Sequence, residues 1–407
     1  QVDYLCKARG IKVGDKIDIQ TMRRHSNSQE PLSSEDLKYD ARALAVFISA
    51  VFEVDVPHEL NVLIPHHNRP YQKGLEINNR RIRCIVKNWD GDFIRVDIDQ
   101  DADEEEYLVR LKDEENHIDH TYLWDLLKEG MQLNLLDCQV KQPIITPRLI
   151  VVEPDYLVDI SSIATCFTAF GHHPLLYLLN MMKPRANTQA TLLGNFAGAA
   201  LDDIINSHGK YQVNNTVKSN FREKALEFCT CPWFDAKKFY TDANLQAFNL
   251  QQVVDILFPR TASQAKMSAF RGESLYDRKK AILEPSFVCE ALGIQGRVDL
   301  MTTDCKLLVE QKSGRNMNIE THQMDPSYHS YQLEPHYVQL LLYYGVLQHN
   351  FKLSNDRVNI RLLYSKYQPQ DGLMVVAYYR KLFQEAIEYR NQLVAASFEI
   401  AKEGFEH

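Results

Sequence analysis

The sequence predicts an α/β protein in which a short mixed sheet is flanked by helices and preceded by a β-rich, barrel-like domain. Residues 1–150 contain several short stretches in which β-branched and polar residues alternate, as they do in half-buried strands. A proline-bounded apolar stretch, QPIITPRLIVV, follows near residue 150 and marks a boundary. Beyond it, helical and strand patterns succeed one another. We therefore expect a β-rich accessory domain over residues 1–150 and an α/β domain over residues 151–407.

The composition is that of an ordinary globular protein. Of the 407 residues, 45% are hydrophobic and 25% are charged, which argues against a disordered or fibrous chain. Lys and Arg number 20 against 27 Asp and Glu in residues 1–150, and 26 against 27 in the remainder. Because neither part carries bulk positive charge, a nucleic-acid partner has to be held by a local groove or a metal site. The sequence also lacks GxxxxGK[ST], so we expect no nucleotide-driven motor.

The sequence contains no signal for a membrane or for secretion. No run approaches the roughly 18 apolar residues that a membrane span needs, and no basic-then-apolar signal opens the chain. Eight cysteines are few for this length, and most stand in apolar stretches, which indicates reduced core thiols. We therefore expect a cytoplasmic protein with no membrane partner.

The elements of the first 150 residues follow from alternation and helical spacing. Asp90-Gly91, between two predicted strands, is a strong signal for a type I′ hairpin turn. A helix is predicted from Ser34 to Phe52, where Ala, Leu, Val and Phe recur at helical spacing. The predicted strands are residues 12–20, 59–65, 80–89 and 93–99.

The second part of the chain predicts helices on both sides of a group of strands. Asp159 opens the first helix as a cap, and helical patterns continue to about residue 260. Basic residues then cluster from Arg260 to Lys280, and strand-like segments fill residues 284–314. The chain closes with a helix at about His336–His349, a strand at 358–365 and a helix at about Leu373–Lys402.

Two neighbouring strand segments carry the residues best suited to chemistry. Glu310 and Lys312 are two residues apart in a strand, so they project from one face, and Asp299 falls beside that face if the strands pair as a hairpin. Carboxylates of this kind suit Mg²⁺ or Mn²⁺, and a lysine beside them can orient an attacking water and offset transition-state charge. The alternative is a Glu–Lys pair on a solvent-exposed strand.

The order and spacing of these residues resemble those of the PD-(D/E)XK nuclease superfamily, and more closely its RecB-like branch. The resemblance covers roughly residues 155–400. The matching pattern is Gly296-x-x-Asp299, ten residues, Glu310-x-Lys312, and Gln339-x-x-x-Tyr343 on a later helix.

The resemblance implies a fold, an activity and a set of partners. The fold would be a restriction-endonuclease-like core, and the activity would be Mg²⁺- or Mn²⁺-dependent hydrolysis of DNA, on single strands or ends. A helicase domain or partner in a DNA-repair or DNA-processing system is also implied.

The resemblance assigns roles to individual residues as well. Asp299 and Glu310 would bind the metal, and Lys312 would act in catalysis. Gln339 and Tyr343 would position the DNA strand. Glu284, at the start of the preceding strand, stands where the family often carries a further acidic metal ligand.

Two departures from the family's pattern concern the metals. The branch usually places a histidine ligand on an early helix, where this chain has Asp202, a carboxylate of suitable chemistry. The alternative is that Asp202 and Asp203 are polar residues of an amphipathic helix. Because no cysteine follows Cys305, the family's four-thiolate iron–sulfur cluster is not expected. A zinc site of Cys166, Cys229 and Cys231 and a set of buried thiols remain alternatives.

Other groups leave a nucleic-acid role open. Trp233, Phe234 and several later tyrosines either stack on bases of single-stranded DNA or belong to the core. The basic cluster from Arg260 to Lys280 either follows phosphates or is solvated surface. A different class of function also stays open: a scaffold that binds nucleic acid through a nuclease fold that no longer cuts.

Overall fold

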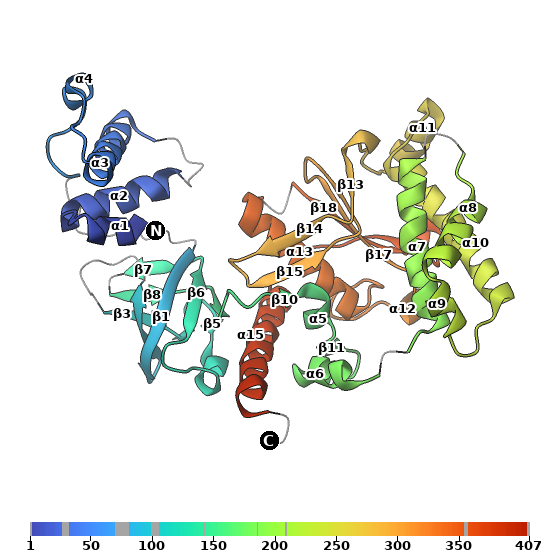
Figure 1. Ribbon diagram of the computed structural model, residues 1–407. Coiled ribbons are helices and arrows are strands. Elements are labelled where there is room, and N and C mark those ends of the chain that lie inside the picture. Colours follow the sequence, from blue (N-terminus) through green and yellow to red (C-terminus); the bar gives the residue numbers. More distant parts are fainter. Residues whose placement is uncertain are drawn as a thin grey trace. The chain divides into compact units, whose positions relative to one another are not determined.

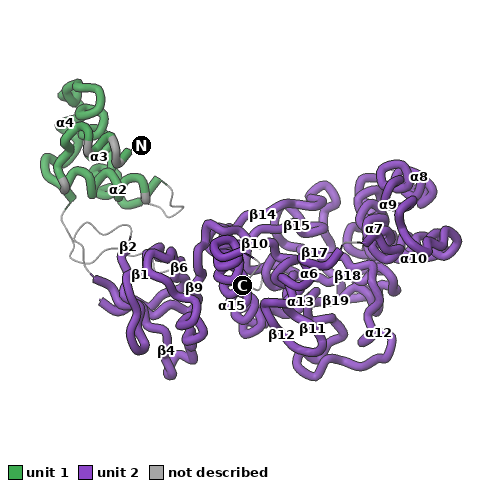
Figure 2. The backbone as a smooth tube through the Cα atoms, turned by 60° about the horizontal axis from the view of Figure 1, so that its bottom comes forward, with its two compact units in different colours: residues 1–78, 100–105 green, residues 79–99, 106–407 purple. Residues whose placement is uncertain are grey.

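The computed structural model describes residues 2–26, 32–69, 81–98, 106–141, 143–184, 186–207, 210–353 and 357–404. They form a mixed α/β protein with several sheets, as predicted. The backbone divides into two compact units, residues 1–78 with 100–105 and residues 79–99 with 106–407 (Figure 2). This division rests on backbone contacts alone, and the functional boundary at residue 150 stays a prediction.

The described part of the first unit is helical, so the strands predicted at 12–20 and 59–65 are wrong. Ile19 and its neighbour Asp18 are both buried, and adjacent residues of a strand would face opposite sides. A helix with a broad buried face accounts for both. The predicted helix from Ser34 to Phe52 is confirmed. The helices are α1 (Val2–Ala8), α2 (Val13–Ser26), α3 (Ser34–Phe52) and α4 (His58–Asn61).

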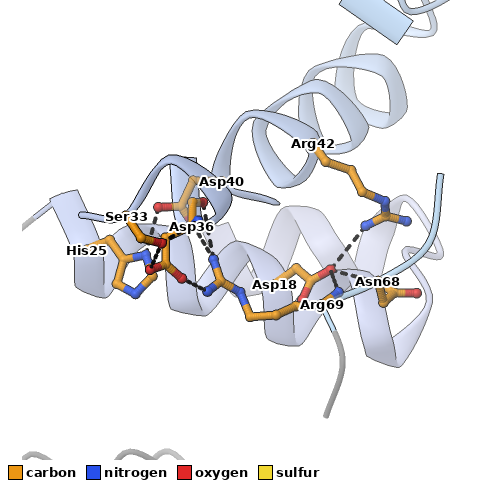
Figure 3. Close-up of polar contacts among 8 residues, drawn as sticks. All are labelled: Asp18, His25, Ser33, Asp36, Asp40, Arg42, Asn68 and Arg69. Atoms are coloured by element: carbon orange, nitrogen blue, oxygen red, sulfur yellow. Dashed lines mark hydrogen bonds and ion pairs between the residues drawn. The ribbon is translucent and has the colours of Figure 1, made fainter. Parts of the chain in front are cut away.

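Ion pairs join the helices of this first unit (Figure 3). Arg42 of α3 donates to Asp15 at 2.8 Å and to Asp18 at 3.0 Å, both on α2. Asn68 adds a hydrogen bond to Asp18 at 2.9 Å. Because Arg42 and Asp18 are buried, each charge depends on the other for compensation.

The second unit begins with a seven-stranded sheet in the order β7-β8-β3-β2-β1-β6-β9. The strands predicted at 80–89 and 93–99 are confirmed, except that residues 80 and 99 lie outside the described residues. The strands are β1 (Arg81–Asp90), β2 (Phe93–Ile98), β3 (Tyr107–Arg110), β6 (Gln132–Leu136), β7 (Gln139–Lys141), β8 (Ile144–Thr146) and β9 (Leu149–Val152), with β4 (Lys112–Asp113), β5 (Ile118–Asp119) and the 3₁₀ helix η1 (Thr121–Asp125) beside them.

The predicted hairpin joins β1 to β2, with a different turn. Asp90 pairs with Phe93, so the two loop residues are Gly91 and Asp92. Of these two, only Gly91 has a positive φ, 56°, which is the pattern of a type II′ turn rather than type I′. The described strands form an open ladder that ends at β7 and β9, so the expected barrel-like shape is corrected to an open sheet.

The remaining elements follow one another as groups of helices and groups of strands (Figure 1). The helices are α5 (Ile160–Ala164), α6 (Leu175–Met182), α7 (Gln189–Asn206), α8 (Val213–Glu223), α9 (Ala225–Cys229), α10 (Ala236–Leu257), α11 (Ala262–Phe270), η2 (Arg278–Lys280), α12 (Met317–Thr321), α13 (Glu334–Phe351), α14 (Pro369–Gly372) and α15 (Arg380–Glu403). The strands are β10 (Val158–Asp159), β11 (Phe167–Thr168), β12 (Gly171–His172), β13 (Ala281–Leu283), β14 (Ser286–Cys289), β15 (Ile294–Arg297), β16 (Leu300–Thr302), β17 (Leu307–Lys312), β18 (Asn359–Tyr364) and β19 (Leu373–Val375). The helix expected from Leu373 therefore begins later, after a short edge strand.

Helices cover both faces of the central five-stranded sheet, whose order is β13-β16-β17-β18-β19. Leu307 and Val309 of β17 pack into a cluster with α7 and α10, whereas Leu308 packs with α13 and α15. Strands β17 and β18 run parallel, and their neighbours run antiparallel. β17 is thus a central strand buried on both faces, which explains its continuous apolar start.

Arg390 of α15 ties the seven-stranded sheet to the rest of the second unit. It is fully buried and donates to the carbonyl of Gly293 at 3.1 Å, that of Glu153 at 2.9 Å and that of Tyr156 at 2.6 Å. Gly293 has a φ of 61°, and a Cβ there would lie 2.3 Å from the Arg390 guanidinium. Glycine is therefore required where the two parts meet.

Candidate active site

Glu310 and Lys312 project from one face of β17, as the alternation predicts. The Lys312 ammonium donates to Glu310 Oε1 at 2.8 Å and to Gln339 Oε1 of α13 at 2.8 Å. Gln311, between them, points the other way and donates to Ser365 Oγ at 2.6 Å. The structure therefore brings together three of the predicted residues, Glu310, Lys312 and Gln339.

Asp299 lies beside this face because β16 and β17 pair as the predicted hairpin. Leu300 pairs with Val309, which places Asp299 next to Glu310 in register. Asp299 Oδ2 accepts a hydrogen bond of 2.5 Å from the backbone N–H of Gln311. The sheet itself thus orients this carboxylate.

Tyr343 contacts β15, the strand that carries Gly296. Its side chain is buried, and its hydroxyl donates to the carbonyl of Arg297 at 2.6 Å. A Cβ at Gly296 would lie 3.0 Å from the Tyr343 ring, so glycine is needed for this contact. The role expected of Tyr343 in positioning DNA stays a prediction, whereas its contact with β15 is observed.

Glu284 and Asp202 approach the same carboxylates from two other elements. Glu284 follows β13 with a φ of 47°, and its backbone N–H donates to the Asp299 carbonyl at 3.0 Å. Its side chain pairs with Arg297 at 3.1 Å. Asp202 of α7 is partly buried, whereas its neighbour Asp203 is exposed and accepts a hydrogen bond from Thr216. The two aspartates are therefore not equivalent.

The electrostatics of this group differ from those of an ordinary surface cluster. Burial and then the nearby charge of Asp299 raise the pKa of Glu310 to about 8, although Lys312 opposes the shift. Burial and then Glu284 and Asp299 raise the pKa of Asp202 to about 6. Burial also raises the pKa of Asp299. Carboxylates that raise one another's pKa values in this way are typical of catalytic and metal sites.

One oxygen of the group has no partner. Among the residues that the structure describes, Glu310 Oε2 has no hydrogen-bond partner, and the residue is only 3% exposed. A buried carboxylate oxygen without a donor is costly, and a divalent cation is a ligand that such an oxygen accepts well.

The donors present fit Mg²⁺ or Mn²⁺ in chemistry, because all four are carboxylates. Among the residues that the structure describes, however, no three His, Cys, Asp or Glu side chains stand as the ready ligands of one ion. Arg297 and Lys312 instead pair with Glu284 and Glu310. A cation would have to compete with these two ion pairs.

The three cysteines of the zinc alternative lie in different surroundings. Cys166 and Cys231 are buried in different hydrophobic clusters. Cys229 is exposed. The three sulfur atoms therefore do not form one tetrahedral site.

Three polar residues behind β17 were missed by the sequence analysis. Gln246 of α10 donates to the Ser313 carbonyl at 3.0 Å and accepts from Ser365 Oγ at 2.6 Å. The Ser365 backbone N–H donates to the Lys312 carbonyl at 2.9 Å. Asn249 binds the Ser365 carbonyl at 3.0 Å. The only available signal was a pair of polar residues one helical turn apart in an apolar stretch of α10.

The basic cluster from Arg260 to Lys280 has a structural use. Arg260 donates to the Ser207 carbonyl, and Arg278 donates to the Ile205 carbonyl at 2.7 Å, both at the end of α7. Cations at a helix C-terminus satisfy its free carbonyls and its dipole. These arginines therefore hold the end of the helix that carries Asp202.

None of the helices in the described ranges combines the length and the apolar character that crossing a membrane requires.

Comparisons with known proteins give little further information. No family model and no curated protein matches the chain. Among solved structures, a protein of Eubacterium rectale named a "putative exonuclease" aligns over 62% of this chain and 84% of its own, with 10% identity and a TM-score of 0.36. This similarity is too weak to carry an argument about fold or function.

Proposed function

We propose that this chain is a metal-dependent deoxyribonuclease of the PD-(D/E)XK type, in its RecB-like branch. The observation that carries the proposal is the group of Asp299, Glu310 and Lys312 on adjacent strands, with one buried oxygen of Glu310 left without a partner. A structural ion pair would need neither the raised pKa values nor the unpartnered oxygen.

Asp299 and Glu310, with Asp202 and Glu284, would hold one or two Mg²⁺ or Mn²⁺ ions. The ion would supply Lewis-acid polarisation of the phosphate and stabilisation of the leaving oxygen. On binding the ion, Glu284 and Glu310 would give up their ion pairs with Arg297 and Lys312, and Glu310 Oε2 would gain a partner.

Lys312 is the residue that would act on the reacting atoms. Its ammonium, held by Glu310 and Gln339, would orient a water molecule and offset the negative charge that develops on the phosphate. The water oxygen forms a bond to phosphorus and releases one proton to the solvent, the bond from phosphorus to the bridging oxygen breaks, and that oxygen takes up one proton. The products are a phosphate end and a hydroxyl end.

The test is cleavage of end-labelled single- and double-stranded DNA with Mg²⁺, with Mn²⁺ and with EDTA. We expect cleavage with either metal, favouring single strands or ends, and none with EDTA. Equal cleavage in EDTA would contradict the metal's role.

A second candidate is a scaffold that binds nucleic acid without cutting it. It is favoured by Asp202 in place of the usual histidine and by the lack of three ready ligands among the described residues. Tight DNA binding without cleavage under any metal condition would select this scaffold over the nuclease.

A further inference from the structure

Trp233 stands out because it is exposed and held in an unusual backbone conformation. It lies in the loop between α9 and α10, is 99% exposed and has a φ of 59°. Tryptophan is among the most buried residues on average, and a bulky side chain at positive φ is an outlier. Since burial in the fold does not compensate for this conformation, a ligand is the natural explanation.

The loop that presents Trp233 is firmly anchored. The next residue, Phe234, packs edge-on against Phe228, with 5.3 Å between ring centres, and in a tilted arrangement against Phe239, with 5.5 Å between ring centres. The backbone N–H of Asp235 donates to Gln189 Oε1 at 2.9 Å. Phe234 therefore belongs to the core, while Trp233 is held outward by a rigid support.

The surroundings of Trp233 favour nucleic acid over a protein partner. Lys237 and Lys238, in the first turn of α10, are both exposed. Exposed aromatic rings with nearby cations are the usual composition of surfaces that bind single-stranded nucleic acid. Protein–protein interfaces, in contrast, are depleted in lysine.

The same loop is connected to the end of β17 through α7. Gln189, which holds the loop, begins α7, and Gly194 follows five residues later, about 7.5 Å along the helix axis. A Cβ at Gly194 would lie 3.2 Å from Ser313 Oγ, on the residue after Lys312. The first turns of α7 thus connect the Trp233 loop with the end of β17, the strand that carries Lys312.

We propose that Trp233 is a stacking platform for a base of single-stranded nucleic acid, with Lys237 and Lys238 on the adjoining phosphates. The proposal deepens the function proposed above. It rests on that function in one respect, namely that the purpose of the binding is to hold the DNA strand that enters the β17 site. Duplex DNA, whose bases are already stacked on one another, gains nothing from this platform.

The test measures binding of labelled oligothymidylate and of a duplex of equal length by fluorescence anisotropy, in EDTA so that cleavage does not interfere. Trp233→Ala should weaken binding of the single strand about 10-fold, whereas Trp233→Phe should retain most of the affinity. The matched control is Trp124→Ala in η1, which removes another partly exposed tryptophan, 37% exposed, and should change nothing. Duplex binding should be the same in all variants.

A second readout separates stacking from a general surface effect. Oligothymidylate should quench the tryptophan emission of the parent, and Trp233→Phe should remove this quenching while keeping the affinity. Trp233→Ala with the parent's affinity for the single strand would overturn the proposal. The absence of single-strand binding in the parent and in every variant would also overturn the proposal, and it would favour a protein partner for Trp233.

Failure of this proposal and failure of the nuclease proposal give different results. A chain that cuts DNA but is insensitive to Trp233→Ala refutes the platform and keeps the nuclease. A chain that never cuts, but whose single-strand binding depends on Trp233, keeps the platform and selects the scaffold function.

Discussion

Two acidic clusters in this molecule look alike in sequence and differ in their electrostatics. The helical unit contains Asp15, Asp18, Asp36 and Asp40, and each of them is bonded to an arginine. The β17 region contains Asp202, Asp299 and Glu310, whose pKa values are all raised. One cluster therefore has the features of a structural group, and the other has those of a catalytic or metal-binding group.

Each carboxylate of the helical cluster is bonded to an arginine, and Figure 3 shows three of them, Asp18, Asp36 and Asp40. Arg69 donates to Asp36 and, at 3.0 Å, to Asp40, which also pairs with His25 at 2.7 Å. Hydrogen bonds from Ser33 and then Arg69 lower the pKa of Asp36, so its charged form is favoured. Such a cluster needs no ligand.

The β17 cluster has the opposite character. Its carboxylates repel one another in a buried place, and Glu310 Oε2 lacks any donor. The number of acids therefore does not identify a site. A site is better indicated by raised carboxylate pKa values and by a carboxylate oxygen without a hydrogen-bond donor, because a bound cation would stabilise both.

The largest effect should come from breaking a balanced pair in the helical unit. Arg42→Met leaves Asp15 and Asp18 without their cation and should destabilise that unit by about 3–5 kcal/mol, the usual loss when one partner of a buried pair is removed. Denaturant unfolding measures this change. A loss below about 1 kcal/mol would show that the cluster is solvated rather than structural.

Lys312→Ala should reduce cleavage by a factor of about 10²–10³, equivalent to roughly 2.7–4 kcal/mol, and leave DNA binding largely intact. The reason is that its charge acts on the transition state. Single-turnover cleavage and anisotropy on the same samples measure both effects. The matched control, Lys280→Ala, removes an exposed lysine paired with Asp304 at 3.0 Å and should cut at the parent's rate. A fully active Lys312→Ala enzyme would contradict the proposed mechanism.

Divalent metal should stabilise the fold through the β17 cluster alone. At a hundredfold excess over its dissociation constant, Mn²⁺ should add about 2.7 kcal/mol. Asp202→Ala should lose part of this gain and part of the cleavage, whereas Asp203→Ala, which removes a contact with Thr216, should keep the metal response. Thermal unfolding with metal titration measures the difference. If Asp202→Ala responds like the parent, Asp202 is only a polar residue of α7.

Without metal, stability should fall as the pH rises. The folded-state pKa values of Asp202 and Glu310, about 6 and about 8, exceed their ordinary values of 3.8 and 4.5. The folded state therefore binds more protons than the unfolded state, and the associated stability is complete below about pH 4 and lost toward pH 8. Melting temperatures in EDTA across this range measure the loss. Asp202→Asn should fall less steeply than the parent, and an equal slope would argue against the assignment.

The smallest effect concerns the network behind β17. Gln246→Leu removes the hydrogen bonds to Ser313 and Ser365 and should lower kcat about 3- to 10-fold with little change in KM, because Lys312 is less firmly positioned. The control on the same helix is Asn244→Ala, whose exposed amide bonds only to the Tyr240 carbonyl. A change confined to KM would mean that Gln246 serves binding instead.

The sequence predicted the β17 face well for a physical reason. Alternation along a strand is a local property, so the shared face of Glu310 and Lys312 and the opposite direction of Gln311 follow from spacing alone. Asp299 followed because β16 and β17 form a local hairpin.

Contacts between segments far apart in the chain could not be predicted from the sequence. Gln246 and Ser365 are separated by 119 residues, and only the packing of α10 against β18 brings them together. Helix α2 was mistaken for a strand because Ile17 and Ile19, two residues apart, fit the strand period, and the decisive burial of Asp18 depends on Arg42 of another helix. Tertiary context overrode the local pattern in both cases.

The most direct test of the comparison is Mn²⁺ binding by titration calorimetry, with the parent, Glu310→Gln and Asp18→Asn measured under the same conditions. The parent and Asp18→Asn should bind the metal with equal affinity, because the helical cluster has no need of it. Glu310→Gln should lose most of the affinity, since it removes the charge and the unpartnered oxygen together. Equal binding by the parent and Glu310→Gln, or no binding by the parent, would contradict the account.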